Sequence, residues 1–408
     1  MTPAPTPAPT PALTPVPRSI TVVGASLAGL STVRALRAEG YDGALTLVGA
    51  ERHLPYDRPP LSKDFLKGAA DADSLALGTA EEYDGLGVEW LLGETAARLD
   101  PAARTVTLGG GRELRTDAVV VATGATPRRL PGTDGLAGVH TLRTLDDAVA
   151  LRADLTAGSP RLVVIGAGFI GAEVAATAHA LGLQVTVVEA VEVPLERALG
   201  REMGLLCAGL HADHGVELLC GTGVAGFSSD GGRVTGVQLA DGRLLPADVV
   251  LVGVGVRPNT DWLAGSGVAV DDGVVCDAGC ATGIPNVLAV GDVARVPHPF
   301  TGRHARIEHW TNAMEQAATA ARTLLSGAST APRAVPPYFW SHQYGSMIQL
   351  AGHVAPGARP RVVEGDLDTR SFVAAYELDG HTTAYLSINQ PKLFNRLRRG
   401  LTPLLATP

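Results

Sequence analysis

The sequence predicts an α/β fold in which two similar parallel-sheet units are followed by a smaller domain of a different kind. The first unit, over residues 18–49, runs from a β-branched segment through a glycine turn and an alanine-rich helical segment to a second β-branched segment. The same order returns over 161–189. A further strand completes each unit, at 117–126 and 247–256. Beyond about residue 326, aromatic and β-branched segments indicate a small antiparallel sheet.

The order of these segments predicts a discontinuous first domain, because the chain builds the second unit before it returns to the first. We expect the first domain at 18–125 and 247–326, the second at 126–246, and the third at 327–408. Residues 1–17 are a Pro-Ala-Thr tract without helix or strand periodicity. We expect them to be a disordered tail, with a spacer or docking arm as the alternative.

Composition excludes several classes of protein. A chain of 408 residues with 46% hydrophobic residues is long enough for two or three domains with separate cores. The net charge of -8 argues against a general nucleic-acid binder, and no uninterrupted apolar run reaches the roughly 18 residues of a membrane span. Four cysteines are too few for a disulfide scaffold and suit a reducing compartment. We therefore expect a cytoplasmic protein without nucleic-acid or membrane partners.

The glycine turn of the second unit matches the dinucleotide-binding fingerprint. Gly166, Gly168 and Gly171 follow a predicted strand and open a predicted helix. Glu189 ends the next strand, where a carboxylate accepts hydrogen bonds from ribose hydroxyls and repels a 2′-phosphate. Ala190 offers no guanidinium to attract such a phosphate. This turn therefore predicts NADH rather than NADPH.

The glycine turn of the first unit is a weaker match. Gly24 and Gly29 occupy the outer positions of the fingerprint, but Ser26 stands at the second position, so that an ordinary tight turn is the alternative. Glu51 is the most plausible acidic partner for a ribose. Two dinucleotide sites in one chain imply two different dinucleotides that exchange electrons, and a flavin is the natural complement to nicotinamide.

Several further motifs occur in a fixed order, and the whole set is more specific than either glycine turn. They are GASLAG, YDRPPLSK at 56–63, ATGATPRRLPG at 122–132, LRTLDDA at 142–148, VVIGAGFIGAE, GVGVRPNT at 253–260, AVGDVA at 289–294, RIEHWTNAMEQA at 306–317 and FWSHQYG. This set, across residues 18–400, resembles the FAD-dependent NADH:ferredoxin reductase family, which includes putidaredoxin reductase and reductases of cytochrome P450 and Rieske-type oxygenase systems.

The resemblance implies a fold and an activity. The fold would be a glutathione-reductase-like flavoprotein architecture, with two Rossmann-like domains for FAD and NADH and a small C-terminal α+β domain. The enzyme would take a hydride from NADH onto FAD and pass single electrons to an iron–sulfur ferredoxin. That ferredoxin would serve a cytochrome P450 or another oxygenase.

The resemblance also implies a set of cofactor-binding residues. For FAD these are Gly24, Ser26, Ala28, Gly29, Glu51, Arg58, Lys63, Ala97, Arg143, Gly291, Asp292 and Trp310, and for NADH they are Gly166, Gly168, Gly171, Glu189 and Gly255. Ala28 and Gly29 would lie beside the pyrophosphate, Ala97 near the adenine through its backbone, and Asp292 on the ribityl chain. Arg143 would touch the cofactor. Glu51 would take the ribose, and Trp310 would lie against the isoalloxazine.

The sequence departs from the family pattern at three places. Ala50 stands where members often have Asp, Ser26 replaces the middle glycine, and His342 stands where Asp is usual. These departures affect the detailed ribose contact rather than the choice of cofactor.

Lys63 and Glu173 are the candidate catalytic residues. Lys63 is one of only three lysines and follows the rigid Pro-Pro-Leu-Ser segment, where a fixed ammonium could stabilise negative charge on a reduced flavin. A helix-surface lysine is the alternative. Glu173 is expected in the first turn of its helix, where a carboxylate suits the helix dipole. The resemblance implies instead that Glu173 pairs with Lys63 beside the flavin and the nicotinamide.

The positions of the cysteines exclude a thiol relay. The first cysteine is Cys207, so no redox pair lies in the segment after the first unit. Cys276 and Cys280 are expected to be structural. Cys207, His211 and His214 share one helical face, a spacing that can hold zinc, but no fourth ligand is evident and no metal site is expected.

Electrons must then leave the flavin directly, and the sequence suggests how. Trp310 and Trp340 could shield the ring from water, and Arg303, Arg306 and Arg396 could form a basic patch for an acidic ferredoxin. Two alternatives remain open: an NADH-dependent reductase of rubredoxin, quinone or oxygen, and a flavoprotein that responds to NADH by binding partners without turnover.

Overall fold

The computed structural model describes residues 16–331 and 334–403. All but the last two residues of the predicted tail therefore lie outside the described part of the chain. Within these residues no helix has the length and apolar character needed to cross a membrane.

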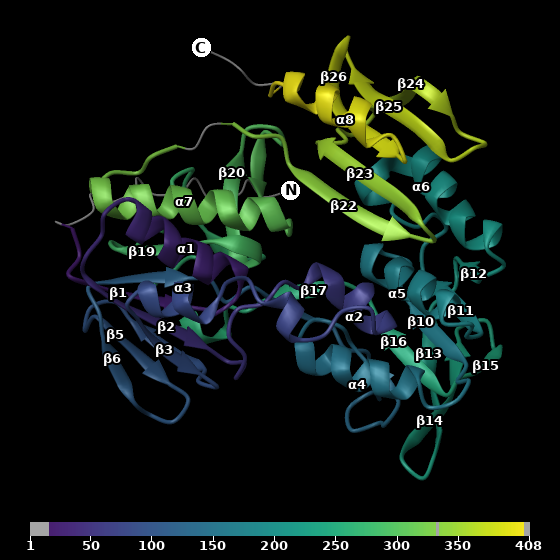
Figure 1. The fold of residues 1–408 in the computed structure, drawn as a ribbon, viewed down its shortest axis with the longest axis horizontal. Helices are drawn as coiled ribbons and strands as arrows, with labels where there is room; N and C mark the ends of the chain where they lie inside the picture. The colour runs from purple at the N-terminus through teal and green to yellow at the C-terminus, as the bar shows by residue number, and fades with distance from the viewer. Residues whose placement is uncertain (1–15, 332–333, 404–408) are drawn as a thin grey trace.

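The first unit is a five-stranded parallel sheet, as expected from its buried β-branched segments. Its strand order is β19-β7-β1-β2-β3, and helix α1 connects β1 to β2. Its elements are β1 (Ser19–Val23), α1 (Leu27–Ala38), β2 (Ala44–Gly49), β3 (Val88–Leu92), β7 (Ala118–Val121) and β19 (Val287–Ala289). Helix α7 (Trp310–Ser326) packs beside α1 (Figure 1), and its first residue, Trp310, contacts Trp340 of the C-terminal sheet.

The second unit repeats this design in the order β12-β11-β10-β16-β9. Its elements are β9 (Val139–His140), α4 (Leu145–Leu155), β10 (Leu162–Ile165), α5 (Phe169–Ala180), β11 (Val185–Glu189), α6 (Glu196–Asp213), β12 (Glu217–Cys220) and β16 (Val249–Val252). Every residue of β10 and β16 is buried, because helices or loops cover both faces of this parallel sheet.

The predicted boundary at residue 247 is wrong. It assigns β16 to the first domain, but Val249 to Val252 pair in parallel with β10 of the second unit. The chain returns to the first domain only at β17 (Val256–Pro258), which pairs with β8 (Ala125–Pro127) as a two-stranded connection. A strand that completes a βαβ unit belongs to that unit, and the boundary therefore lies beyond Val252.

The third domain contains the antiparallel sheet that its aromatic and β-branched segments predict. The order is β22-β23-β26-β25-β24. Its elements are β22 (Tyr338–Gln343), β23 (Ser346–Gly352), β24 (Arg359–Asp366), β25 (Ser371–Leu378), β26 (His381–Ile388) and α8 (Pro391–Leu397). One face packs on α6, where Phe372 and Tyr376 meet Leu199 and Met203 in a shared core (Figure 1).

Shorter elements complete the described chain. The remaining helices are η1 (Pro59–Ser62), α2 (Asp64–Lys67), η2 (Asp73–Leu75), α3 (Ala80–Gly85), η3 (Asp261–Leu263), η4 (Gly291–Val293) and η5 (Arg398–Gly400). The remaining strands are β4 (Ala96–Asp100), β5 (Thr105–Leu108), β6 (Glu113–Arg115), β13 (Val224–Asp230), β14 (Arg233–Leu239), β15 (Leu244–Pro246), β18 (Val274–Val275), β20 (Ala294–His298) and β21 (Arg303–Ala305).

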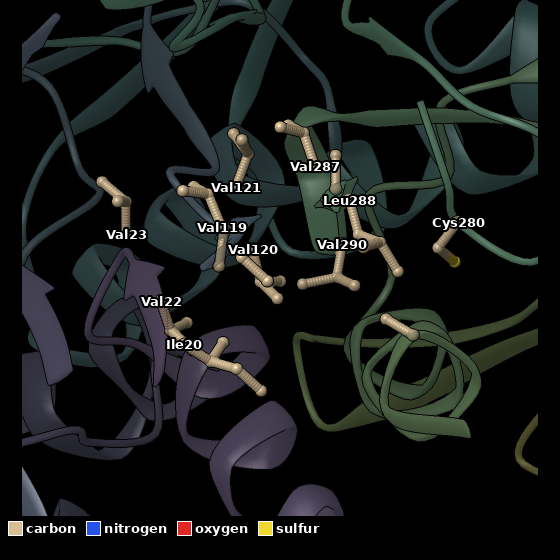
Figure 2. Packing of buried hydrophobic residues seen from close by; sticks show 14 of the residues in the cluster. Ile20, Val22, Val23, Val119, Val120, Val121, Cys280, Val287, Leu288 and Val290 are labelled. Carbon is tan, nitrogen blue, oxygen red and sulfur yellow. The ribbon is translucent and has the colours of Figure 1, made fainter. Parts of the chain in front are cut away.

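The core of the first unit lies between its sheet and the helices above it. Figure 2 shows valines of β1, β7 and β19 converging there, with Cys280 at the margin. Cys276 and Cys280 are both buried in this core, and burial raises the pKa of the Cys280 thiol to about 12. Two thiols held in this state are structural, as their position in the sequence suggests.

The cysteine and histidines of α6 have other partners than a metal. Cys207 is buried against the C-terminal sheet, His211 Nδ1 shares a 2.7 Å hydrogen bond with the Tyr344 hydroxyl, and the His214 ring stacks on Tyr344. No group of three or more His, Cys, Asp or Glu side chains in the described residues is arranged to hold a metal ion. The contacts of His211 and His214 with Tyr344 instead join the C-terminal end of α6 to the turn between β22 and β23.

Burial of His211 should make the stability of the protein depend on pH. Burial lowers the pKa of His211 from 6.5 to about 4, so the unfolded chain binds a proton that the folded chain excludes. The free energy of unfolding should therefore fall as pH decreases from about 6.5 to about 4. His211→Gln should reduce the accompanying loss of Tm by on the order of a few degrees. The control is His381→Gln, because His381 is exposed. If Tm depends on pH equally in both variants, the pH dependence of stability does not arise from His211.

Candidate functional site

The first glycine turn is fixed by close backbone contacts at the carboxyl end of β1. Gly24 has φ of +123°, and a Cβ there would lie 2.1 Å from the Ala122 carbonyl oxygen. A Cβ on Gly29 would lie 1.9 Å from the Gly24 carbonyl oxygen. Ser26 takes the extended conformation that precedes α1, and its hydroxyl accepts a 3.2 Å hydrogen bond from Arg58 Nε. The serine therefore replaces the middle glycine without strain in the backbone.

A second loop of the first unit closes against the start of α1. A Cβ on Gly291 would lie 2.9 Å from the Cβ of Ala28, so glycine lets these two segments approach. The next residue, Asp292, accepts a 2.7 Å hydrogen bond from Arg143 Nη2. Four predicted FAD residues from three distant parts of the sequence therefore come together near the N-terminus of α1: Ala28, Arg143, Gly291 and Asp292.

Glu51 is held by side chains from the motif that follows it. Its Oε1 accepts from Arg58 Nη2 at 2.6 Å, and its Oε2 accepts from the Tyr56 hydroxyl at 2.5 Å. Arg58 also donates to the Arg143 carbonyl oxygen, and the backbone N–H of Leu145 donates to the Tyr56 hydroxyl at 2.8 Å. Burial raises the pKa of Tyr56, so this hydroxyl stays protonated as a donor. Each Glu51 oxygen keeps a further lone pair for a ribose hydroxyl.

Ala97 lies at a β-bulge. The ladder between β4 and β5 pairs Ala96 with Leu108 and then Arg98 with Thr107, so Ala97 falls outside the register. A bulge releases backbone groups from the ladder, and it is typical of strand positions next to a ligand. The predicted backbone contact with the adenine is compatible with this position.

Lys63 and Glu173 form an ion pair between the two units. Lys63 Nζ lies 2.7 Å from Glu173 Oε2, and the side chains are only 15% and 4% exposed. Helix α5 begins at Phe169, so Glu173 lies in its second turn and the expectation of a first-turn carboxylate is wrong. Ser62 donates to Glu173 Oε2 at 2.5 Å, and Ser341 donates to Oε1 at 2.8 Å. Partners on other elements, rather than the helix dipole, account for this buried charge.

The predicted aromatic pair lies beside the ion pair. Trp310 is the first residue of α7, and its Nε1–H donates to Asp57 Oδ1 at 2.9 Å. Burial raises the pKa of Asp57, while this hydrogen bond and the charge of Lys63 oppose the rise. The rings of Trp310 and Trp340 meet edge to face with centroids 6.3 Å apart. Both tryptophans are only partly buried.

The glycine turn of the second unit leaves open space at its middle position. A Cβ on Gly166 would lie 2.4 Å from the Gly253 carbonyl oxygen, and a Cβ on Gly171 would lie 2.0 Å from that of Gly166. A Cβ on Gly168 would meet no protein atom within 4 Å. The chain itself thus requires the outer glycines, whereas the gap at Gly168 fits a phosphate at the N-terminus of α5.

Glu189 folds back over this turn. Its Oε2 accepts from the backbone N–H of Ala167 at 2.8 Å, and its Oε1 accepts from that of Val191 at 3.1 Å. These bonds fix the carboxylate at the carboxyl end of β11, where a ribose would lie. Gly255, with φ of +94°, also has no protein atom near a built Cβ.

Only two of the three arginines predicted to form a basic patch are exposed to solvent. Arg303 and Arg396 are exposed, but the Arg306 side chain is 10% exposed and contacts Glu308 at 2.5 Å and Asp272 at 3.4 Å. It also donates to the Asp292 carbonyl oxygen. The positive charge of Arg306 is therefore balanced by two neighbouring carboxylates, and its side chain is not part of an exposed basic patch. Arg398, which sequence reasoning missed, lies 4.2 Å from the centre of the Tyr338 ring, and Tyr338 stacks on Trp340.

Sequence reasoning also missed Ser62, Ser341 and Asp57 as partners of the site. Ser62 and Ser341 contact Glu173 across 111 and 168 residues of sequence, so no local spacing could have paired them. All three lie within motifs already quoted above, YDRPPLSK and FWSHQYG. Those motifs were the only available signal.

Two glycine turns at the carboxyl ends of two parallel sheets, linked by a buried ion pair, define a protein with two adjacent dinucleotide sites. Comparison with known proteins agrees. Residues 18–317 match the family described as pyridine nucleotide-disulphide oxidoreductase, and residues 338–403 match the reductase C-terminal family. The chain belongs to the pyridine nucleotide-disulphide oxidoreductase family. This membership implies FAD and NADH as the two dinucleotides, and the open gap at Gly168 and the cradle around α1 fit them.

Similar proteins cover nearly the whole chain. Rhodocoxin reductase of Rhodococcus erythropolis is 41% identical over 92% of this chain and 87% of its own. The ferredoxin–NAD(+) reductase subunit of a Pseudomonas putida benzene 1,2-dioxygenase system is 39% identical over 93% and 92%. The structure of a covalent putidaredoxin reductase–putidaredoxin complex matches with a TM-score of 0.89, at 36% identity over 93% of this chain and 92% of the matched chain.

Alanine substitutions should separate the ligand-facing glycine from the glycine that packs the fold. Gly168→Ala should leave Tm nearly unchanged, because its Cβ meets no protein atom, but should weaken NADH binding by at least about tenfold. Gly171→Ala should destabilise the protein by about 1–3 kcal/mol or more, because its Cβ overlaps a carbonyl oxygen. Thermal melts and NADH titrations measure the two effects. Unaltered NADH binding by Gly168→Ala would contradict the predicted phosphate position.

Proposed function

We propose that the protein is a cytoplasmic reductase that oxidises NADH and passes the electrons one at a time to an iron–sulfur ferredoxin serving a cytochrome P450 or another oxygenase. The observation that carries the proposal is the Lys63–Glu173 ion pair, which joins two dinucleotide sites in a chain without a cysteine before Cys207. The names of relatives support it, since they include ferredoxin reductases of dioxygenase systems and putidaredoxin reductase.

The first unit is the FAD site of this proposal. FAD supplies, when bound, an isoalloxazine ring that accepts two electrons together and releases them singly. The backbone around Gly24 and Gly29 and the N-terminus of α1 would hold the pyrophosphate, and Glu51 would hold the adenosine ribose. Asp292, oriented by its 2.7 Å bond to Arg143, would accept from the ribityl hydroxyls.

The second unit is the NADH site. The open position at Gly168 admits the pyrophosphate, and the fixed carboxylate of Glu189 accepts from the ribose hydroxyls while it repels a 2′-phosphate. Glu173 lies in the second turn of α5. The helix whose N-terminus would face the pyrophosphate therefore also carries the carboxylate that contacts Lys63.

Lys63 and its neighbours supply alignment and electrostatics rather than acid–base chemistry. The chemistry that the two bound cofactors would supply is a direct hydride transfer, in which no residue would have to transfer a proton, so the residues would contribute alignment. The Lys63 ammonium, held at 2.7 Å from Glu173, is a fixed positive charge that stabilises negative charge on a neighbouring ring. Trp310, held by Asp57, and Trp340 would exclude water from the site.

NADH should be preferred over NADPH. In stopped-flow mixing with the FAD-loaded protein, NADH should bleach the flavin absorption at least about tenfold faster than NADPH at equal concentration, because Glu189 repels the 2′-phosphate. Glu189→Gln should narrow this preference by removing the negative charge. Equal rates with both nucleotides in the unaltered protein would show that the assignment of NADH is wrong.

Reduction of cytochrome c should require added ferredoxin. With an acidic ferredoxin the rate should fall as salt increases, and Arg396→Glu should raise the KM for ferredoxin several-fold while NADH still bleaches the flavin normally. Arg115, the exposed last residue of β6, provides the matched control, because Arg115→Glu makes the same charge change. Cytochrome c reduction that is equally fast without ferredoxin would favour an alternative acceptor, and slow turnover with every acceptor would favour a partner-binding role.

A further inference from the structure

The Glu173 carboxylate is the point where all three domains meet. Glu173 lies on α5 of the second unit and is almost completely buried. Its Oε2 accepts from Lys63 at 2.7 Å and from the Ser62 hydroxyl at 2.5 Å, both from the first unit. Its Oε1 accepts from the Ser341 hydroxyl at 2.8 Å and from the backbone N–H of His342 at 3.2 Å, both from β22 of the third domain.

The surroundings of each hydroxyl direct its single proton towards this carboxylate. Ser341 Oγ accepts a 3.2 Å hydrogen bond from Gln343 Nε2, which leaves its proton for Glu173. Ser62 Oγ accepts from Lys63 Nζ at 3.3 Å and lies 3.5 Å from the Pro59 carbonyl oxygen, a much longer contact than the one with Glu173. Thr177, one turn along α5 from Glu173, also donates to the Ser62 carbonyl oxygen at 2.8 Å and holds η1 against α5.

We infer that Ser62 and Ser341 are positioning residues, which keep the Glu173 carboxylate ionised and turned so that its Oε2 faces the Lys63 ammonium. A hydrogen bond to the charged form of a carboxylate favours that form, and two such bonds on different oxygens also fix its rotation. Through Glu173 the two hydroxyls set the position of the Lys63 ammonium beside the proposed flavin site. The effect on NADH oxidation rests on the proposed function, whereas the ionisation of Glu173 does not.

Charged side chains from several elements lie around the Glu173 carboxylate. Lys63 contacts the carboxylate directly, and the side chain of His342, whose backbone N–H donates to it, is close enough to be affected by its charge. Burial and then the charge of Lys63 lower the pKa of His342, with smaller effects from Glu173, Asp64 and Lys67. Asp57 is coupled to Lys63 on its other side. None of these groups is altered in the serine variants, so their titration is common to all proteins compared.

The test compares three single variants of the FAD-loaded protein. Ser341→Ala and Ser62→Ala each remove one hydroxyl from the carboxylate. Ser387→Ala removes an equally buried hydroxyl from β26 of the same sheet as Ser341, where its Oγ accepts a 3.2 Å hydrogen bond from the Gln390 backbone N–H. Stopped-flow reduction by NADH is measured against pH. The acid side of the profile should move to higher pH in the first two variants and stay in place in Ser387→Ala, because only the first two remove a hydrogen bond that favours the charged carboxylate.

An infrared titration measures the ionisation of Glu173 without turnover. The carboxylic acid C=O band that appears on acidification, identified by its loss in Glu173→Gln, should rise at higher pH in Ser341→Ala and Ser62→Ala than in Ser387→Ala. Ser341→Thr, which keeps the hydroxyl, should restore the original titration. If Ser341→Ala loses FAD and does not fold, Ser62→Ala carries the same test on the other oxygen.

The outcomes separate this inference from the proposed function. Identical infrared titrations in the serine variants and the Ser387→Ala control would overturn the inference, whatever the rates show. An unaltered protein that NADH fails to reduce, but whose Glu173 band moves as expected in the serine variants, would overturn the proposed function and leave the positioning role supported.

Discussion

The structure depends on one buried negative charge. A carboxylate that is 4% exposed is costly unless donors satisfy it, and the donors of Glu173, which lies in the second domain, come from the first and the third domains. Its burial therefore requires the two glycine-turn units and the C-terminal sheet to sit together. The shared core of Phe372 with Leu199 and the contact of His211 with Tyr344 also hold the C-terminal sheet against α6 of the second unit.

This arrangement gives each domain a distinct task. The two parallel sheets present their carboxyl ends and helix N-termini to two dinucleotides, which is where α/β folds bind ligands. The antiparallel sheet closes over the junction and contributes Trp340 and Ser341 from one strand. Because that strand alternates its side chains, the aromatic ring and the hydroxyl reach different neighbours from adjacent positions.

The features that the sequence predicted well are those determined locally. The positions of Gly24, Gly29, Gly166 and Gly171 follow from the shape of a single turn, and each proves sterically necessary. The errors arise where contacts with a segment that is distant in the sequence determine a residue's environment. The boundary at 247 separates the strand at 249–252 from the second unit that it completes, the charge of Arg306 is neutralised by Asp272 and Glu308, and Ser62 and Ser341 meet Glu173 only through the tertiary fold.

The distribution of the four cysteines gives the protein a single accessible thiol. Burial raises the pKa of Cys207 and Cys280 to about 12, and Cys276 is equally enclosed, whereas Cys220 is exposed at the end of β12. Cys220 pairs in register with Glu189, the acid of the second glycine turn. A thiol-reactive fluorophore or spin label would therefore attach to the unmutated chain at one place, next to the proposed nicotinamide nucleotide site, and report directly on its occupancy.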